Sequence, residues 1–308
     1  MELRHLRYFI AVAEEGSLST AAEMRLHTAQ PSLSRQIRDL ELEVGVRLFE
    51  RKARGIALTA AGRIFLDHAR MIMLQVETAG EAARRADQSD KPEFSVGFLI
   101  GQEVTWLPEI LRVLREVAPD IAVTIISQSS PELALSLMRG KADVALIRRE
   151  KEAAGLHFKP LFSEPLLVAM PSSHRLAAEK AISPQELTRE LLIGPSRAAP
   201  MLRAAIDEYA KRVGIALKYS YDADNISAGM SLLAATGGLF LLPLYGSNLL
   251  TPGVVMRPLE GDAPTIELVL AYSKSNTSRY LKQLLSRLDE VVANVQKQMA
   301  NAGSLEAS

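Results

Sequence analysis

The chain has 308 residues, of which 48% are apolar, so it is long enough to fold into two or three compact units with apolar cores. Its 36 basic and 36 acidic residues balance, which excludes an overall positive field that would hold the whole chain on a nucleic acid or an acidic membrane. It has no cysteine, which excludes a disulfide framework, a thiolate nucleophile and a Cys-ligated metal site.

The N-terminal segment does not have the pattern of a targeting or membrane-spanning sequence. Its apolar run, Tyr8 to Ala13, covers only six residues before two glutamates. A signal-peptide core or a membrane span needs a longer run. We therefore expect a cytoplasmic protein that does not interact with a membrane.

Residues 3–45 predict three helices. Apolar side chains recur at three- and four-residue spacings in the first, which Gly16 ends, and Ser17 can cap a second helix over 18–26. Thr28 can accept a backbone N–H at the start of the third. Pro31 is tolerated there because the N–H it lacks would have no partner within the first turn.

Residues 46–51 and 55–59 predict two short strands around a turn. Gly55 can adopt the positive φ of a tight hairpin at that turn. Three helices followed by a hairpin make a winged helix-turn-helix, which we assign to residues 1–58.

A long helix is predicted from Thr59 to about Ala86, where the chain has no proline. The side chains on one stripe repeat near the 3.5-residue period of a coiled coil: Ala61, Phe65, His68, Ile72, Gln75 and Ala79. Because such a helix has no core of its own, we expect it to pack against a second copy in a dimer. This linker helix and a polar hinge occupy residues 59–90.

Short apolar runs alternate with helical patterns after the hinge, which predicts an α/β effector-binding domain over residues 91–300 with a parallel sheet. The alternation falls into two blocks, a first lobe of about 91–161 and 265–300 and a second lobe of about 162–264. Two lobes joined by crossing strands leave a cleft, where ligands bind at strand ends.

Residues 18–37 have the length of a helix-turn-helix, whose second helix presents its N-terminal side chains to the major groove. Gln30 can pair with an adenine edge, Pro31 can contact a thymine methyl, and serines can serve bases or phosphates. Residues 25–54 carry seven basic and four acidic side chains, a local net charge of +3. The alternative is an ordinary helical hairpin with capping serines.

The segment LRHLRYFIAVAEEGSLSTAAEMRLHTAQPSLSRQIRDLELEVGVRLFER followed by LTAAGRIFL resembles the LysR-type transcriptional regulators. The resemblance implies a winged helix, a dimerising linker helix and a two-lobed domain like the periplasmic binding proteins, assembled as a homodimer and usually a homotetramer. It also implies that Arg54 in the wing reaches a minor groove. The candidate DNA-binding residues are Thr28, Gln30, Pro31, Ser32, Ser34, Arg35, Arg38, Arg51 and Arg54.

The candidate effector-binding residues follow predicted strands or begin predicted helices: Ile100, Gly101, Gln102, Ser127, Ser129, Ser130, Ile147, Arg148, Asn225 and Pro243. Ser129 and Ser130 precede a helix start, where free N–H groups favour a carboxylate, although the same serines can be plain caps. Of Arg148 and Arg149, we favour Arg148 as the partner of an anion.

The resemblance suggests that effector sites use these regions, and some relatives that begin ELRHLRYF govern operons degrading aromatic acids. We therefore expect a small aromatic or unsaturated carboxylate as effector, with no other cofactor and no metal. The hypothesis is a ligand-responsive regulator of a catabolic operon, with activation as the expected mode and repression as the open alternative. Its partners are double-stranded DNA, further copies of itself and RNA polymerase.

Two alternatives remain at this point. An enzyme would need a catalytic motif, but the five histidines show no metal-ligand spacing and the chain has no phosphate-binding glycine loop or nucleophile elbow. A transport-type binding protein would share the two-lobed half. The DNA-binding pattern of the N-terminal domain argues against it.

Overall fold

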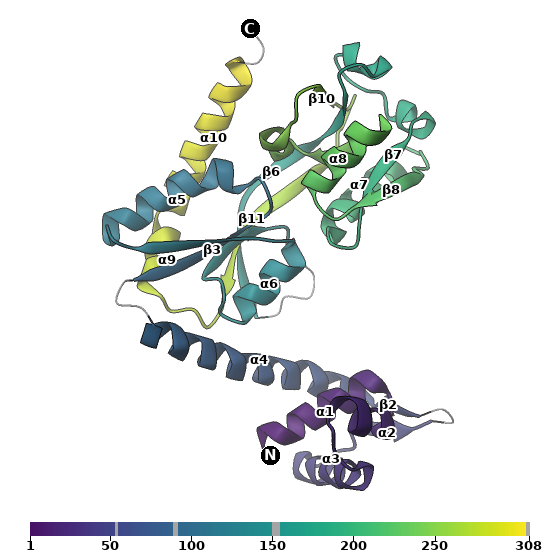
Figure 1. The fold of residues 1–308 in the computed structure, drawn as a ribbon, viewed down its shortest axis with the longest axis vertical. Helices are drawn as coiled ribbons and strands as arrows, with labels where there is room; N and C mark the ends of the chain where they lie inside the picture. The colour runs from purple at the N-terminus through teal and green to yellow at the C-terminus, as the bar shows by residue number, and fades with distance from the viewer. Residues whose placement is uncertain (53–54, 89–91, 150–154, 306–308) are drawn as a thin grey trace. The chain divides into compact units, whose positions relative to one another are not determined.

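The computed structural model describes residues 1–52, 55–88, 92–149 and 155–305. The chain forms two compact units, Met1–Ala86 and Asp87–Ser308, each with its own core (Figure 1). Among the helices that the structure describes, none is long and apolar enough to cross a membrane.

The N-terminal unit contains helices and one hairpin, in the order α1 (Leu3–Glu15), α2 (Leu18–Thr20), a π-helical turn η1 (Ala21–Arg25), α3 (Gln30–Val44), β1 (Phe49–Arg51), β2 (Ile56–Leu58) and α4, which begins at Ala60 and ends at Gln88. Gly16 and Gly45 take positive φ values of 62° and 83° at the ends of α1 and α3, which confirms both as stop signals. Ser17 caps α2, its Oγ accepting the Thr20 N–H at 3.3 Å.

The helix-turn-helix differs from the prediction at two points. The predicted second helix is α-helical for three residues only and continues as the π-helical η1. The predicted Thr28 cap is wrong, because α3 is preceded by Ala29, which offers no side-chain acceptor. The Thr28 N–H instead donates to the Ala22 carbonyl at 2.9 Å, and His27 takes a positive φ of 48° in the turn.

The wing packs against the helices through aromatic rings. Phe9 of α1 lies 5.0 Å from both Phe49 of β1 and Phe65 of α4, measured between ring centroids. Gly55 has the positive φ, 88°, that the hairpin requires. Further along α4, the side chains of the predicted stripe no longer pack in this core, because His68, Ile72, Gln75 and Ala79 are exposed.

The C-terminal unit follows the order β3 (Glu93–Phe98), α5 (Glu103–Val117), β4 (Ala122–Ser127), α6 (Ser130–Met138), β5 (Val144–Ile147), β6 (Leu156–Pro171), η2 (Arg175–Ala178), η3 (Pro184–Arg189), β7 (Leu192–Pro195), α7 (Pro200–Arg212), β8 (Tyr219–Ala223), α8 (Ile226–Thr236), β9 (Leu239–Pro243), η4 (Leu244–Leu249), β10 (Val254–Pro258), β11 (Thr265–Ser273), α9 (Arg279–Ser286) and α10 (Leu288–Leu305). Its strands form a nine-stranded sheet in the order β4-β3-β5-β11-β6-β9-β7-β8, with β10 paired to β6.

The sheet has two parallel halves joined by an antiparallel pair. β3 runs parallel to β4 and β5, and β7 runs parallel to β8 and β9, as the alternation of strands and helices predicts. The long β6 pairs with β11 in antiparallel register and then continues to β9 and β10. β6 and β11 therefore pass between the lobes, and the crossing strands that the sequence predicts are present (Figure 1).

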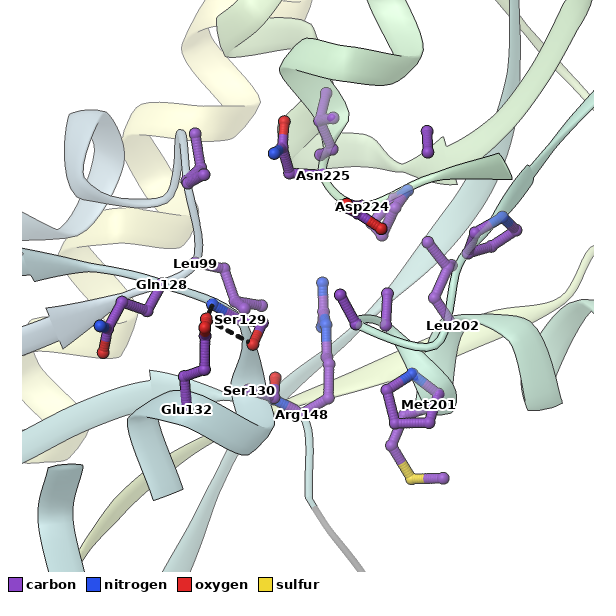
Figure 2. Close-up of a pocket in the computed structure, with 18 of the residues that line it drawn as sticks. Leu99, Gln128, Ser129, Ser130, Glu132, Arg148, Met201, Leu202, Asp224 and Asn225 are labelled. Atoms are coloured by element: carbon purple, nitrogen blue, oxygen red, sulfur yellow. Dashed lines mark hydrogen bonds between the residues drawn. The ribbon is translucent and has the colours of Figure 1, made fainter. Parts of the chain in front are cut away.

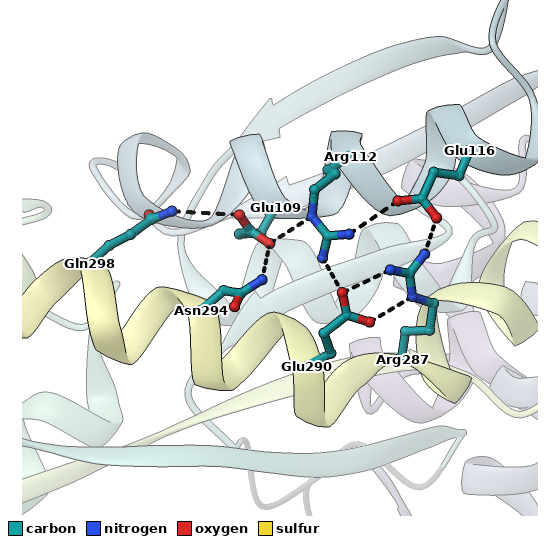
Figure 3. Close-up of polar contacts among 7 residues, drawn as sticks. All are labelled: Glu109, Arg112, Glu116, Arg287, Glu290, Asn294 and Gln298. Atoms are coloured by element: carbon teal, nitrogen blue, oxygen red, sulfur yellow. Dashed lines mark hydrogen bonds and ion pairs between the residues drawn. The ribbon is translucent and has the colours of Figure 1, made fainter.

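Polar contacts hold α10 on α5, which returns the C-terminal segment to the first lobe (Figure 3). Glu290 accepts hydrogen bonds from Arg287 at 2.8 Å and from Arg112 at 2.7 Å. Arg287, and with it Arg112, lowers the pKa of Glu290 to about 2. The predicted terminal helix is divided at Arg287, which ends α9.

Candidate functional site

The outward face of α3 carries most of the predicted DNA-binding residues. Leu33, Ile37 and Leu40 are buried against the unit's core, which turns the opposite face of the helix to solvent. The side chains of this reading face are exposed at Gln30, Pro31, Ser32, Arg35 and Arg38 and half-buried at Ser34.

The two arginines of the reading face, Arg35 and Arg38, make few contacts within the protein. The Arg35 side chain is 79% exposed and its Nε lies 3.9 Å from Asp39. Arg38 donates through Nε to the Ser34 carbonyl at 3.3 Å. Both guanidinium groups retain donors that can contact phosphates or base edges.

The remaining predicted DNA-binding residues lie outside α3. Thr28 is half-buried in the turn that precedes the helix, and Arg51 is exposed on β1 of the wing. Arg54 falls outside the described residues. The structure thus brings the α3 residues together on one face, with the wing beside them in the same unit.

A cavity of about 540 Å³ lies between the two lobes of the C-terminal unit (Figure 2). One wall comes from the carboxyl ends of β3, β4 and β5, and the other from the segment before α7, the start of α8 and the end of β9. Its lining residues are Leu99, Ile100, Ser127, Gln128, Ser129, Ser130, Glu132, Arg148, Pro195, Ala198, Ala199, Pro200, Met201, Leu202, Ala223, Asp224, Asn225, Ile226, Phe240, Pro243 and Tyr245.

Seven of the predicted effector residues line this cavity: Ile100, Ser127, Ser129, Ser130, Arg148, Asn225 and Pro243. Three predicted residues are not in the lining. Gly101 faces Leu249, whose Cδ1 would lie 2.8 Å from an added Cβ. Gln102 is buried beside Glu164, and Ile147 is fully buried in the first lobe's core because its strand has apolar neighbours on both faces.

Arg148 is the cation in this lining, and it is 5% exposed. Its Nη2 lies 2.5 Å from Glu164 Oε1, and its backbone N–H donates to Ser130 Oγ at 2.9 Å. Figure 2 shows its side chain extending into the space between Ser129 and the second lobe. Arg149, by contrast, is exposed and lies 5.5 Å from the ring centroid of Phe158.

Glu164 connects Arg148 to the second lobe. Its Oε2 accepts the Tyr245 N–H at 3.0 Å, and its side chain is completely buried. Burial raises the pKa of Tyr245 to about 12, against the opposing effect of Arg148, so this phenol is neutral at physiological pH. The Arg148–Glu164 ion pair therefore connects the end of β5 with β6, and the hydrogen bond from Tyr245 to Glu164 connects η4 with β6.

The helix starts at the cavity have internal partners. Ser129 begins α6 in a capping box with Glu132, and the Ser129 N–H and Oγ lie 3.1 and 2.8 Å from Glu132 Oε2. These hydrogen bonds hold the pKa of Glu132 below its usual range. Asn225 caps α8 by accepting the Ala228 N–H at 2.9 Å. Ser129 is thus confirmed as a cap, while its role toward a ligand stays a prediction.

Sequence reasoning missed Glu164, Asp224 and the lining segment around Met201 and Leu202. A carboxylate inside the apolar strand at 161–171 was a usable signal for Glu164, because an unpaired buried charge is costly and implies a partner. Asp224 and the 195–202 segment carry no comparable signal. Among the described residues, no group of three or more His, Asp or Glu is placed to hold a metal ion.

Two family models match the two units. Residues 3–63 match the bacterial regulatory helix-turn-helix protein, lysR family, and residues 87–293 match the LysR substrate binding domain. The chain belongs to the LysR family of transcriptional regulators. This assignment removes the enzyme and transport-protein alternatives.

Curated relatives resemble this LysR-type chain over nearly its full length. It is 37% identical over 300 residues to the Hca operon transcriptional activator HcaR of Escherichia coli (strain K12), covering 96% of this chain and 99% of HcaR. It is 32% identical over 286 residues to the regulator AlsR of Bacillus subtilis (strain 168), covering 92% and 94%.

Solved full-length regulators share the architecture. The crystal structure of CbnR matches with a TM-score of 0.56 at 28% identity, covering 95% of this chain and 100% of CbnR. CbnR in complex with its target DNA matches with a TM-score of 0.55 at 28% identity and the same coverage. Full-length BenM matches with a TM-score of 0.56 at 26% identity, covering 97% and 98%.

Proposed function

We propose that this LysR-type protein regulates a catabolic operon in the cytoplasm in response to a small aromatic or unsaturated carboxylate bound between its lobes. The observation that carries the proposal is the cavity of about 540 Å³ in a chain whose other unit presents a helix with Gln30, Arg35 and Arg38 exposed on one face. A relative named as the Hca operon transcriptional activator and another named as a probable cat1 operon transcriptional activator support the regulatory part.

The two walls of the cavity fit an amphipathic ligand. The first lobe contributes hydroxyls at Ser127, Ser129 and Ser130 beside Arg148, which suit a carboxylate. The second lobe contributes the apolar segment around Met201 and Leu202, which suits a ring or an unsaturated chain. We assign the carboxylate end to the first lobe and the apolar end to the second, with no further cofactor.

Self-association completes the proposed DNA-binding form. The exposed stripe of α4, including His68 and Ile72, offers a face for a second copy, and Ile64 on the same helix is 65% exposed. Two copies place two α3 helices on the half-sites of one operator. A tetramer made from two such dimers, and its contact with RNA polymerase, form part of the same proposal.

The test is a footprint of the full chain on its own upstream intergenic DNA, with and without benzoate, cinnamate or cis,cis-muconate. A thermal shift of the protein identifies which carboxylate binds. We expect a two-fold symmetric protected site whose pattern changes with the carboxylate that binds. Protection that is unchanged by every carboxylate that binds would contradict an effector role for the cavity.

A further inference from the structure

We propose that the cavity selects monocarboxylates and rejects dicarboxylates, an inference that rests on the proposed effector class and narrows it. The first reason is the charge state of its cation. Arg148 already forms a buried ion pair with Glu164 at 2.5 Å, so its charge is balanced before a ligand arrives. A ligand carboxylate can use the remaining N–H donors of Arg148 but meets little uncompensated positive charge.

The second reason is the charge of the walls. Glu132 on the first lobe and Asp224 on the second both line the cavity. The hydrogen bonds from Ser129 lower the pKa of Glu132 and so keep it anionic, and Asp224 Oδ1 accepts the Ser196 hydroxyl at 2.5 Å. Figure 2 places Glu132 and Asp224 on opposite sides of the Arg148 side chain. Ligand groups that extend away from Arg148 therefore approach negative charge.

The third reason is the lack of a second cation. Within the parts of the chain that the structure describes, Arg148 is the one Lys, Arg or His that lines the cavity. Arg197 belongs to the neighbouring loop, but its side chain is exposed and is not in the lining. A second ligand carboxylate would lose its hydration against the apolar segment of the second lobe without gaining a cation as a partner.

The charges of the lining predict that the first carboxylate of a ligand weakens binding only slightly. A second carboxylate on the same ligand should weaken binding strongly. The first carboxylate has the Ser130 hydroxyl and the Arg148 donors, which are polar without requiring net positive charge. The second carboxylate meets repulsion from Glu132 and Asp224, and the described lining offers it no second cation. Aromatic and unsaturated monocarboxylates fit this balance.

The experiment titrates the full chain calorimetrically with ligand pairs in which a methyl group is replaced by a carboxylate. The pairs are 4-methylbenzoate and terephthalate, 4-methylcinnamate and 4-carboxycinnamate, and sorbate and muconate. We expect that, in every pair with a binding monocarboxylate, the dicarboxylate binds at least about tenfold more weakly. A dicarboxylate that binds as tightly as its partner overturns the inference and leaves a carboxylate effector standing.

Charge-removing variants identify the cause. Glu132→Gln keeps the capping box, because Gln serves in it as Glu does, and Asp224→Asn keeps an acceptor for Ser196. The double variant is expected to narrow the ratio of monocarboxylate to dicarboxylate affinity within a pair by about tenfold. Asp222→Asn is the matched control, since Asp222 is exposed on β8, two residues before Asp224, and does not line the cavity.

The outcomes separate the inference from the proposal beneath it. If the ratio of monocarboxylate to dicarboxylate affinity is unchanged in the double variant, Glu132 and Asp224 do not cause the selectivity. If no member of any pair binds while the chain still binds its upstream DNA, the carboxylate effector itself is wrong and the inference falls with it. The comparison within pairs uses the wild-type chain, so it stands whether or not the variants fold.

Discussion

Polar side chains on the reading face of α3 and in the cavity between the lobes differ in exposure and in their hydrogen-bond partners. On α3 the side chains are exposed, and Arg35 is approached by Asp39 only at 3.9 Å. In the cavity Arg148 is paired with Glu164, and Asn225 caps a helix. DNA can therefore bind the exposed donors of α3 directly. A small ligand in the cavity can bind only the donors that are not already used in hydrogen bonds within the protein. The comparison implies that α3 variants change DNA binding and that variants of the Arg148 pair change stability first.

The largest effect is expected from breaking the buried pair. Glu164→Ala leaves Arg148 buried without its partner and should lower the free energy of unfolding of the C-terminal unit by about 3–5 kcal/mol. Urea denaturation of the full chain, followed by circular dichroism, measures the change. The double variant Arg148→Met with Glu164→Leu is the control, because it removes both charges together.

The control decides how the pair acts. If the charge imbalance causes the loss, the double variant should be much more stable than Glu164→Ala. Equal losses in the two variants would show that packing, and not the ion pair, holds this region together. In that case the contrast between the cavity and α3 would not rest on charge.

A smaller effect is expected on α3. Gln30→Ala should reduce the preference for operator over random DNA by about 1–3 kcal/mol, with little change in affinity for random DNA. Arg35→Ala is the comparison, because loss of a phosphate contact weakens binding to operator DNA and to random DNA alike. It also lowers the slope of log affinity against log salt concentration by about 1. Fluorescence anisotropy at several salt concentrations measures all four affinities. An equal fall on both DNAs in Gln30→Ala would rule out base reading.

The smallest effect concerns the turn that holds α3. His27 adopts a positive φ of 48°, which costs an L side chain roughly 1 kcal/mol more than glycine. His27→Gly should therefore raise the unfolding free energy of the N-terminal unit by up to about 1 kcal/mol in thermal denaturation. Thr28→Gly, one residue on and without a positive φ, should lower it instead. A stabilising Thr28→Gly would contradict the backbone explanation.

The sequence predicted the N-terminal unit well because its signals are local. Gly16, Ser17, Gly45 and Gly55 each act on the backbone within a few residues, and the structure shows each in its predicted role. The predicted Thr28 cap is wrong because Ala29 is the N-cap of α3 and the second helix ends in the π-helical η1 before the turn. Propensity did not distinguish these two geometries.

The cavity was predicted less completely because it is assembled from distant segments. Arg148 could be found, since a charge directly after an apolar strand is unusual. Its partner Glu164 lies within β6, 16 residues further along the chain, and Asp224 lines the cavity from the second lobe. The pairing of β11 with both β5 and β6 places Arg148 beside Glu164, and that pairing is not encoded in a short motif.

The central claim is that the exposed face of α3 reads sequence in the DNA this protein controls. The direct measurement is the affinity of the full chain for a duplex from its own upstream intergenic region against a shuffled duplex of equal length and composition, at physiological salt. The account predicts a preference of about a thousandfold or more for the native duplex. Equal affinities for the two duplexes would contradict it.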